Sequence, residues 1–183
     1  MNILFLGDCE NQIVHFLNEE NDVSVWDAKV NSEFVSQFDY VISYGYTHII
    51  EKDIIDMSKN GIINLHISYL PWNRGSSPNI WSFIDGTKKG VTIHYIDEGI
   101  DTGDIIIQKE LYFDEDKETL KTSYNKLKDE IEKLFINNWD NIINKNFDIK
   151  KQNKNDGSVH YDKDTDSIMN RIDFDLPINE LRI

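Results

Sequence analysis

The sequence is poor in cysteine, basic residues and long apolar runs, and each scarcity excludes a class of protein. The single cysteine, Cys9, cannot form an internal disulfide and fits a reducing compartment. The chain has 19 Lys and Arg against 33 Asp and Glu, a formal net charge of −14, so its surface repels nucleic-acid backbones. We therefore expect a small-molecule substrate and no nucleic acid. The opening MNILFLGD lacks a basic start and is too short for a signal segment or membrane span, so we expect a cytoplasmic protein without membrane contact.

The motifs that indicate a metal or dinucleotide site are also missing. No C-x-x-C or H-E-x-x-H pattern occurs, so we expect no metal site. Gly7 is followed by DCENQ rather than by further glycines, which argues against a nicotinamide-binding loop. The acidic stretch IDEGIDTGD (96–104) is similar in composition to a calcium loop, but its glycines and Ile100 do not match EF-hand ligand spacing. The expected chemistry is that of side chains acting on a small molecule.

Apolar runs that alternate with helical patterns predict an α/β fold with a mainly parallel sheet flanked by helices. At 183 residues the chain is long enough to bury a core and is most simply one domain. Strands are predicted over 2–7, 23–28, 39–46, 62–68, 91–97 and 104–113, and helices over 11–19, 32–38, 51–61, 78–86 and 118–144. The last helix has apolar residues at a steady spacing of three to four, which is typical of an amphipathic helix packed on a sheet.

The composition changes near residue 150. Residues 150–166 are polar and are expected to be irregular, and the remaining chain regains scattered apolar residues. We therefore divide the sequence into a main domain, 1–149, and a polar C-terminal extension, 150–183. The extension is expected to form a dimer contact or part of a substrate site.

The segment NLHISYLPWNRG (64–75) places two polar side chains in an otherwise apolar strand. Residues two apart face the same side of a strand, so Asn64 and His66 project together. Ligands of open parallel sheets bind beyond the carboxyl ends of the strands, and the break at Pro71 puts this pair near that edge. Asp101, between two glycines of DEGIDTGD (97–104), offers a carboxylate to orient the imidazole. An amide, an imidazole and a carboxylate together suit acyl transfer.

Each of these residues also has an ordinary structural explanation. From spacing alone, an Asn and His pair in a strand is more often a hydrogen-bonded part of the core. Arg74 is either a solvated loop residue or a ligand for phosphate. His94 is expected to support the wall of the site rather than to react. The aromatic residues Trp72, Trp81 and Tyr46 either stack on a flat ring or pack against their neighbours.

Taken whole, residues 64–106 resemble the formyltransferase family that uses N10-formyltetrahydrofolate. The family signature is Asn-x-His on a central strand, an S-x-L-P loop, and an Asp near the end of D-x-G-x-D-x-G. Here these fall on Asn64, His66, the loop 68–71 and Asp101. The resemblance implies a Rossmann-like formyltransferase fold over 1–149, N10-formyltetrahydrofolate as co-substrate, and Asn64, His66 and Asp101 as catalytic residues. Asn64 would donate to the oxyanion, His66 would act as general base or oxyanion stabiliser, and Asp101 would orient His66.

The resemblance also implies two sets of binding residues. SYGYTHII (43–50) is similar to the family loop whose backbone holds the pterin ring. The implied co-substrate residues are Tyr46, Thr47, His48, Ile49, Asp97 and Gly99. The implied acceptor residues are Tyr69, Trp72, Asn73, Arg74 and Gly75.

Within the family, the loop LPWNRGSSPNIW (70–81) looks most like that of the nucleotide-sugar N-formyltransferases. That likeness implies a nucleotide-linked amino sugar, such as a dTDP- or UDP-linked one, as acceptor, and a homodimer as the assembly. The tRNA-modifying branch carries a further C-terminal domain and a basic surface, which this sequence does not show. A glycinamide-ribonucleotide-type transformylase and a formyl-folate hydrolase remain as alternatives, and so does a binding protein without turnover.

Overall fold

The computed structural model describes residues 1–181 and is built on one central six-stranded sheet. The strand order is β2-β1-β3-β4-β6-β7. The strands are β1 (Asn2–Gly7), β2 (Asp22–Trp26), β3 (Tyr40–Tyr44), β4 (Ile62–His66), β6 (Lys89–Tyr95) and β7 (Ile105–Leu111). The first four run parallel, whereas β6 and β7 are antiparallel to their neighbours. The predicted α/β fold is confirmed, with an antiparallel end added to a parallel sheet.

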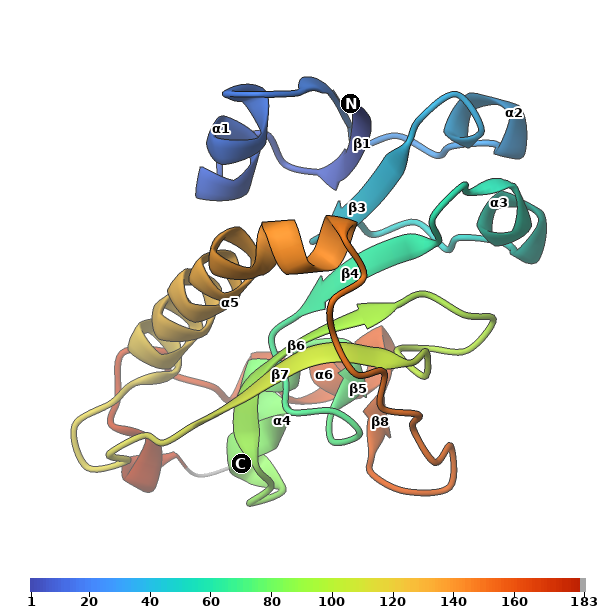
Figure 1. The fold of residues 1–183 in the computed structure, drawn as a ribbon. Coiled ribbons are helices and arrows are strands. Elements are labelled where there is room, and N and C mark those ends of the chain that lie inside the picture. Colours follow the sequence, from blue (N-terminus) through green and yellow to red (C-terminus); the bar gives the residue numbers. More distant parts are fainter. Residues whose placement is uncertain (182–183) are drawn as a thin grey trace.

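Helices cover both faces of the sheet (Figure 1), and this explains why the parallel strands read as continuous apolar runs. On one face lie α1 (Gln12–Asn18) and the long α5 (Leu120–Ile143), which bury apolar side chains with residues such as Ile63. On the other face lie α2 (Ser32–Val35) and α3 (Lys52–Met57). The described chain has no helix that is both long and apolar enough to cross a bilayer.

Helix ends follow local polar chemistry. Asn11 caps α1 and Asn31 caps α2 by accepting from the backbone N–H three residues later. Thr119 caps α5 in the same way, with Thr122 completing a capping box. The prediction that a helix continues from 51 to Gly61 is wrong at its end. Ser58 adopts an extended conformation, so α3 stops at Met57.

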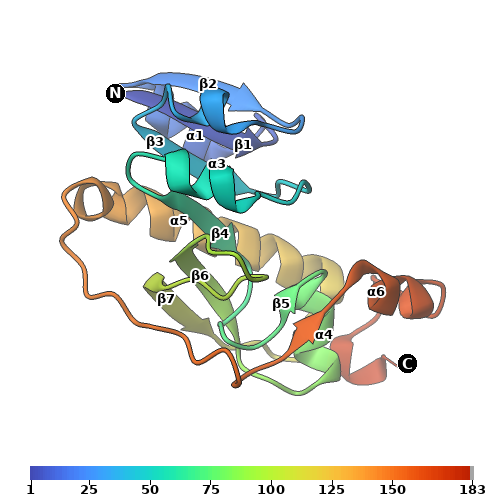
Figure 2. The same cartoon turned by 90° about the vertical axis from the view of Figure 1, so that its right-hand side faces the viewer.

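The C-terminal segment departs most from the prediction. The polar stretch expected to be irregular over 150–166 contains β8 (Val159–His160), which pairs in parallel with β5 (Arg74–Gly75), and the start of α6 (Asp162–Met169). Figure 2 shows this segment running past the edge of the sheet toward β5 and α4 (Pro78–Ile84). A short 3-10 helix, Ile178–Glu180, follows.

Apolar side chains anchor this segment. Ile168 and Ile178 are buried with Ile80 of α4 and Leu120 of α5 in one cluster. Backbone hydrogen bonds add to this, since Ile178 N–H donates to Glu118 C=O at 2.9 Å and Asn179 N–H to Glu115 C=O at 3.1 Å. Thus the extension folds back onto the helices that follow β4.

Candidate active site

Asn64 and His66 lie at the carboxyl end of β4 on the same face of the strand, as the spacing predicts. His66 is 8% exposed, and its Nε2 lies 3.1 Å from the backbone oxygen of Asn73. A carbonyl only accepts, so this contact places a proton on Nε2. The other ring nitrogen, Nδ1, is thereby directed at Asp101, with 3.6 Å between Nδ1 and Oδ2.

Asp101 reaches this pair from the loop that joins β6 to β7. Its backbone has φ of +48°, a left-handed conformation that few side chains adopt and that Asp tolerates better than most. The Oδ2 atom accepts from Gly75 N–H at 2.8 Å, and Oδ1 accepts from Asn64 Nδ2 at 3.3 Å. The carboxylate therefore touches both polar residues of β4 and the loop that follows them. The structure brings Asn64, His66 and Asp101 into one cluster.

The neighbours of Asp101 stabilise the ionised form of its carboxylate. Burial alone raises the pKa of Asp101, but the positive charge available on His66, contacts with His94, and the Gly75 N–H outweigh it. The net result is that the pKa of Asp101 lies well below its ordinary value. Asp101 is thus a fixed anion beside an imidazole, an arrangement that stabilises positive charge on His66.

His94 is a fourth member of the cluster. The register of β4 and β6 pairs it with Asn64, and its Nε2 lies 3.1 Å from Asn64 Nδ2 and 3.4 Å from Asp101 Oδ1. Its Nδ1 lies 2.8 Å from its neighbour's carbonyl, Tyr95 O, so the proton of the neutral ring sits on Nδ1 and Nε2 accepts from Asn64. Sequence reasoning expected a supporting role for His94, but could not place it against Asn64 because the antiparallel pairing was not foreseen.

The residues 46–49 implied for the co-substrate lie in a loop at the same edge of the sheet. Ser43 of β3 pairs with Asn64, so the loop 45–50 leaves β3 beside the cluster. In that loop Ile49 is 83% exposed, and the Tyr46 and His48 rings meet edge to face at 5.2 Å. The other implied residues, Asp97 and Gly99, precede Asp101 in its loop. The Asp97 carboxylate there accepts from Gly99 N–H and from Lys154 Nζ, both at 2.9 Å. A co-substrate role for these residues stays a prediction.

The residues implied for the acceptor divide into two groups. Trp72 is exposed and Tyr69 is half-buried under Lys88, whose Nζ lies 5.0 Å from the ring centroid. Arg74 and Asn73, in contrast, are buried. Of the two alternatives for Arg74, the solvated loop residue is wrong, because the side chain is buried and its guanidinium bonds the C-terminal segment.

Arg74 donates to Gln152 Oε1 at 3.1 Å and to the backbone oxygens of Asn153 and Lys154. Asn73 donates to Thr87 Oγ1 at 2.7 Å. These contacts hold the chain around Gly75, the residue whose N–H binds Asp101. An acceptor-binding role for Asn73, Arg74 and Gly75 stays a prediction, and the contacts of the two side chains are structural.

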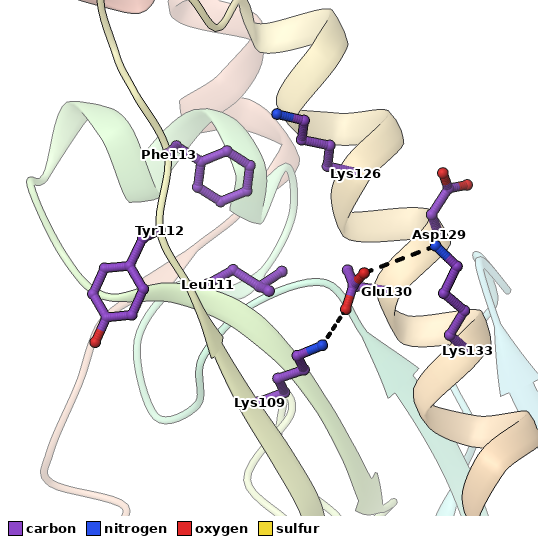
Figure 3. Close-up of a pocket in the computed structure, with 8 residues that line it drawn as sticks. All are labelled: Lys109, Leu111, Tyr112, Phe113, Lys126, Asp129, Glu130 and Lys133. Carbon is purple, nitrogen blue, oxygen red and sulfur yellow. Dashed lines mark hydrogen bonds and ion pairs between the residues drawn. The ribbon is translucent and has the colours of Figure 1, made fainter.

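A separate hollow of about 310 Å³ lies between β7 and α5 (Figure 3). Its walls carry Tyr112, Lys126 and Lys133, and Lys109 pairs with Glu130 across it. None of the implied catalytic or binding residues lines this hollow. It is therefore distinct from the cluster at the end of β4.

Comparison with known proteins identifies the family of this chain. The formyl transferase family model matches residues 11–138, and the chain belongs to that family. Among curated relatives, the methionyl-tRNA formyltransferase of Clostridium tetani is 32% identical over 145 residues, covering 79% of this chain and 46% of that protein. This chain therefore spans about half the length of such relatives.

Among solved structures, the formyltransferase PseJ from Anoxybacillus kamchatkensis matches with a TM-score of 0.91 and 41% identity, covering 99% of this chain and 97% of that one. That structure holds UDP-4,6-dideoxy-4-formamido-L-AltNAc and tetrahydrofolate. A 4-N formyltransferase from Francisella tularensis matches with a TM-score of 0.79 and 27% identity, covering 95% of this chain and 81% of that one.

Proposed function

We propose that this protein transfers the formyl group of N10-formyltetrahydrofolate to the 4-amino group of a UDP-linked 4-amino-4,6-dideoxy sugar. The observation that carries the proposal is the match to PseJ, which extends over nearly the full length of both chains at 41% identity. The product in that neighbour bears its formyl group on a 4-amino nitrogen of a UDP-linked sugar.

The cluster at the end of β4 suits formyl transfer to an amine. When a neutral amine attacks the formyl carbon, negative charge grows on the carbonyl oxygen and a proton must leave the nitrogen. Asn64 Nδ2 has two hydrogens, which face Asp101 Oδ1 at 3.3 Å and His94 Nε2 at 3.1 Å. In the reaction Asn64 turns one of them from its present partner to the carbonyl oxygen, as the kind of donor whose removal costs roughly 10²–10³ in rate. His66 takes the amine proton, and Asp101, 3.6 Å from its Nδ1, stabilises the resulting imidazolium.

The competing acceptor is methionyl-tRNA, because the curated relatives carry that name. Those matches cover at most about half of each relative, 46% and 29% for the first two. The net charge of −14 also disfavours binding a polyanion such as tRNA. Sugar transfer is therefore the better-supported proposal.

A direct comparison of acceptors tests the proposal. Purified protein would be incubated with N10-formyltetrahydrofolate and either a UDP-4-amino-4,6-dideoxy sugar, glycinamide ribonucleotide, or methionyl-tRNA, and the products identified by mass spectrometry. We expect a mass gain of one formyl group on the sugar nucleotide alone. Formylation of methionyl-tRNA or the purine precursor instead would refute the proposal, and formate release without any acceptor would indicate a hydrolase.

Two variants make the comparison specific to the site. His66→Asn should abolish transfer while co-substrate binding, measured by titration, remains. The matched control is His15→Asn, which changes an exposed histidine of α1 outside the cluster. Equal activity in the two variants would remove His66 from the mechanism.

A further inference from the structure

A second hollow, of about 730 Å³, lies between the start of α4, the start of α5 and the C-terminal segment. Its lining is mainly apolar and includes Ile67, Pro78, Leu120, Tyr124, Met169 and Phe174. This volume is within the range of small-molecule pockets, roughly 300–1,000 Å³. No catalytic or binding residue implied by the sequence lines it, so neither of the predicted binding sets accounts for it.

The pocket adjoins the cluster at two points of the chain. Ile67, at one end of the pocket, directly follows His66. Ser77, also in the lining, comes two residues after Gly75, whose N–H binds Asp101 at 2.8 Å. Ile67 packs on the α5 side with Ile63 and Leu65, whereas His66 faces the other side of the strand, so a ligand in this pocket reaches the imidazole around the carboxyl end of β4.

The pocket lies on the side left open for the acceptor. Two substrates must meet at His66, and the co-substrate is implied against the loop 45–50 and the loop that carries Asp97. These loops follow β3 and β6, whereas the pocket is formed by α4 and α5 beyond the end of β4. The pocket and the loops implied for the co-substrate are therefore built from different elements.

The wall between α4 and α5 is rigid. Asn79 is buried and donates to Leu120 C=O at 2.9 Å, while its own oxygen accepts from Ser123 Oγ at 2.9 Å. Both ends of the amide are thus satisfied, and the two helices are fixed relative to each other. A preformed wall lowers the ordering cost of binding.

The opposite wall comes from the C-terminal segment. Lys121 N–H bonds Phe174 C=O at 3.4 Å, and Thr119 forms a bridge with Pro177, so residues 174–177 run along the start of α5. Met169 and Phe174 face the pocket from this segment. These residues lie outside the 11–138 family match, so family membership alone does not specify this wall.

The lining changes character along its length. Near Ile67 and Pro78 it is apolar, which suits the deoxygenated carbons of a dideoxy sugar. Tyr124 is 45% exposed, and Lys128 Nζ lies 5.9 Å from the centroid of its ring, so a planar base would stack on the opposite face of the ring. Lys121 also lines the pocket, and its ammonium lies 3.6 Å from Asp175, an exposed pairing that a phosphate can replace.

We propose that this pocket binds the nucleoside-diphosphate part of the acceptor, with the base on Tyr124 and the diphosphate at Lys121, so that the C-terminal segment helps to select the acceptor. The inference rests on the proposed function for the identity of the acceptor. Two roles are expected for the 150–183 extension, a dimer contact or part of a substrate site, and this inference assigns it the second.

The test compares Tyr124→Ala, Tyr124→Phe and Lys121→Gln with Tyr112→Ala as control. Tyr112 is 87% exposed and belongs to the separate hollow of Figure 3. Because Tyr124→Ala removes base stacking on the ring, it should raise the KM for the UDP-sugar about tenfold. The KM for N10-formyltetrahydrofolate and kcat should stay within about twofold. Tyr124→Phe, which keeps the ring, should recover most of the affinity that Tyr124→Ala loses, and the control Tyr112→Ala should match the wild type.

Calorimetric titration with UDP alone separates this inference from the proposed function. UDP should bind the wild type and bind Tyr124→Ala about tenfold more weakly. Lys121→Gln should weaken UDP several-fold at low salt and less at 0.5 M salt, because screening shortens the reach of a surface charge. If the sugar is formylated but neither variant changes the KM or the UDP affinity, the pocket assignment is wrong while the proposed function stands. If no sugar is formylated yet UDP binding depends on Tyr124, the pocket stands and the acceptor assignment fails.

Discussion

Replacement of Asp101 by Asn is the sharpest test of the cluster, because it removes one charge and little volume. In the structure the carboxylate oxygen Oδ2 lies 3.6 Å from His66 Nδ1. At an effective dielectric constant of about 20, a full charge pair at that distance is worth about 4–5 kcal/mol. With about half of the proton charge developed on His66 in the transition state, the loss is about 2–2.5 kcal/mol. This corresponds to roughly 30- to 70-fold in kcat.

The change should act on turnover and leave most of the stability. The amide oxygen introduced by Asp101→Asn can still accept from Gly75 N–H, so we expect a loss of about 1.5 kcal/mol in the free energy of unfolding. For a chain of this length that is about 3–6 °C in Tm. The assay is steady-state formylation with both substrates saturating, beside a thermal melt of the same preparation.

The matched control is Asp114→Asn, which removes a carboxylate paired with Lys117 on a loop away from the cluster. It should leave kcat unchanged. A loss of less than threefold in Asp101→Asn, or a loss confined to KM, would refute the electrostatic role of this carboxylate.

Four further outcomes follow from the same contacts. Asn64→Ala should lower kcat by roughly 10²–10³ with little change in either KM, measured by initial rates; an unaltered kcat would exclude an oxyanion donor here. His94→Ala, which removes the partner 3.1 Å from Asn64 Nδ2, should lower kcat but preserve co-substrate affinity, and a change in affinity alone would contradict a positioning role. Arg74→Met should make residues 152–158 more susceptible to limited proteolysis, and resistance to the protease would count against the anchoring role. Steady-state kinetics should show that its KM for the sugar nucleotide rises more than its KM for the folate. Because the pKa of Asp101 is lowered in the folded state, the ionised carboxylate stabilises the protein above about pH 4, and this stabilisation is lost as the pH falls toward the folded pKa. The difference in Tm between wild type and Asp101→Asn should therefore become smaller in acid, as measured by thermal melts over a pH series.

Local pattern was sufficient for most of the sheet and for part of the cluster. The apolar runs of β1 and β3 and the alternation at Asn64 and His66 are readable because burial and strand pleat act on neighbouring residues. Asp101 is a candidate from its place between two glycines, and the family motif is what links it to Asn64, because 37 residues separate the two and no local period connects them.

What pattern could not supply are the contacts between distant segments. The pairing of β4 with β6 sets His94 against Asn64, and strand direction is not encoded in either strand alone. The same reason explains why residues 150–166 are predicted to be irregular although they contain β8. β8 is only two residues long and lies in a polar stretch, and it exists as a strand because Arg74 and Gly75 offer it a backbone partner. The burial of Arg74 depends on that partner as well.

Gln152 gives the tail an influence that reaches the carboxylate itself. Its side-chain Nε2 donates to the backbone oxygens of Asp101 at 3.0 Å and Gly103 at 2.7 Å, and its Oε1 accepts a hydrogen bond from the Arg74 guanidinium. During synthesis, the chain as far as Gly103 emerges long before residue 152 does. The loop 97–104 therefore gains its hydrogen bonds from Gln152 late. A nascent chain that already contains Asn64, His66 and Asp101 still lacks the side-chain amide that holds the backbone of Asp101.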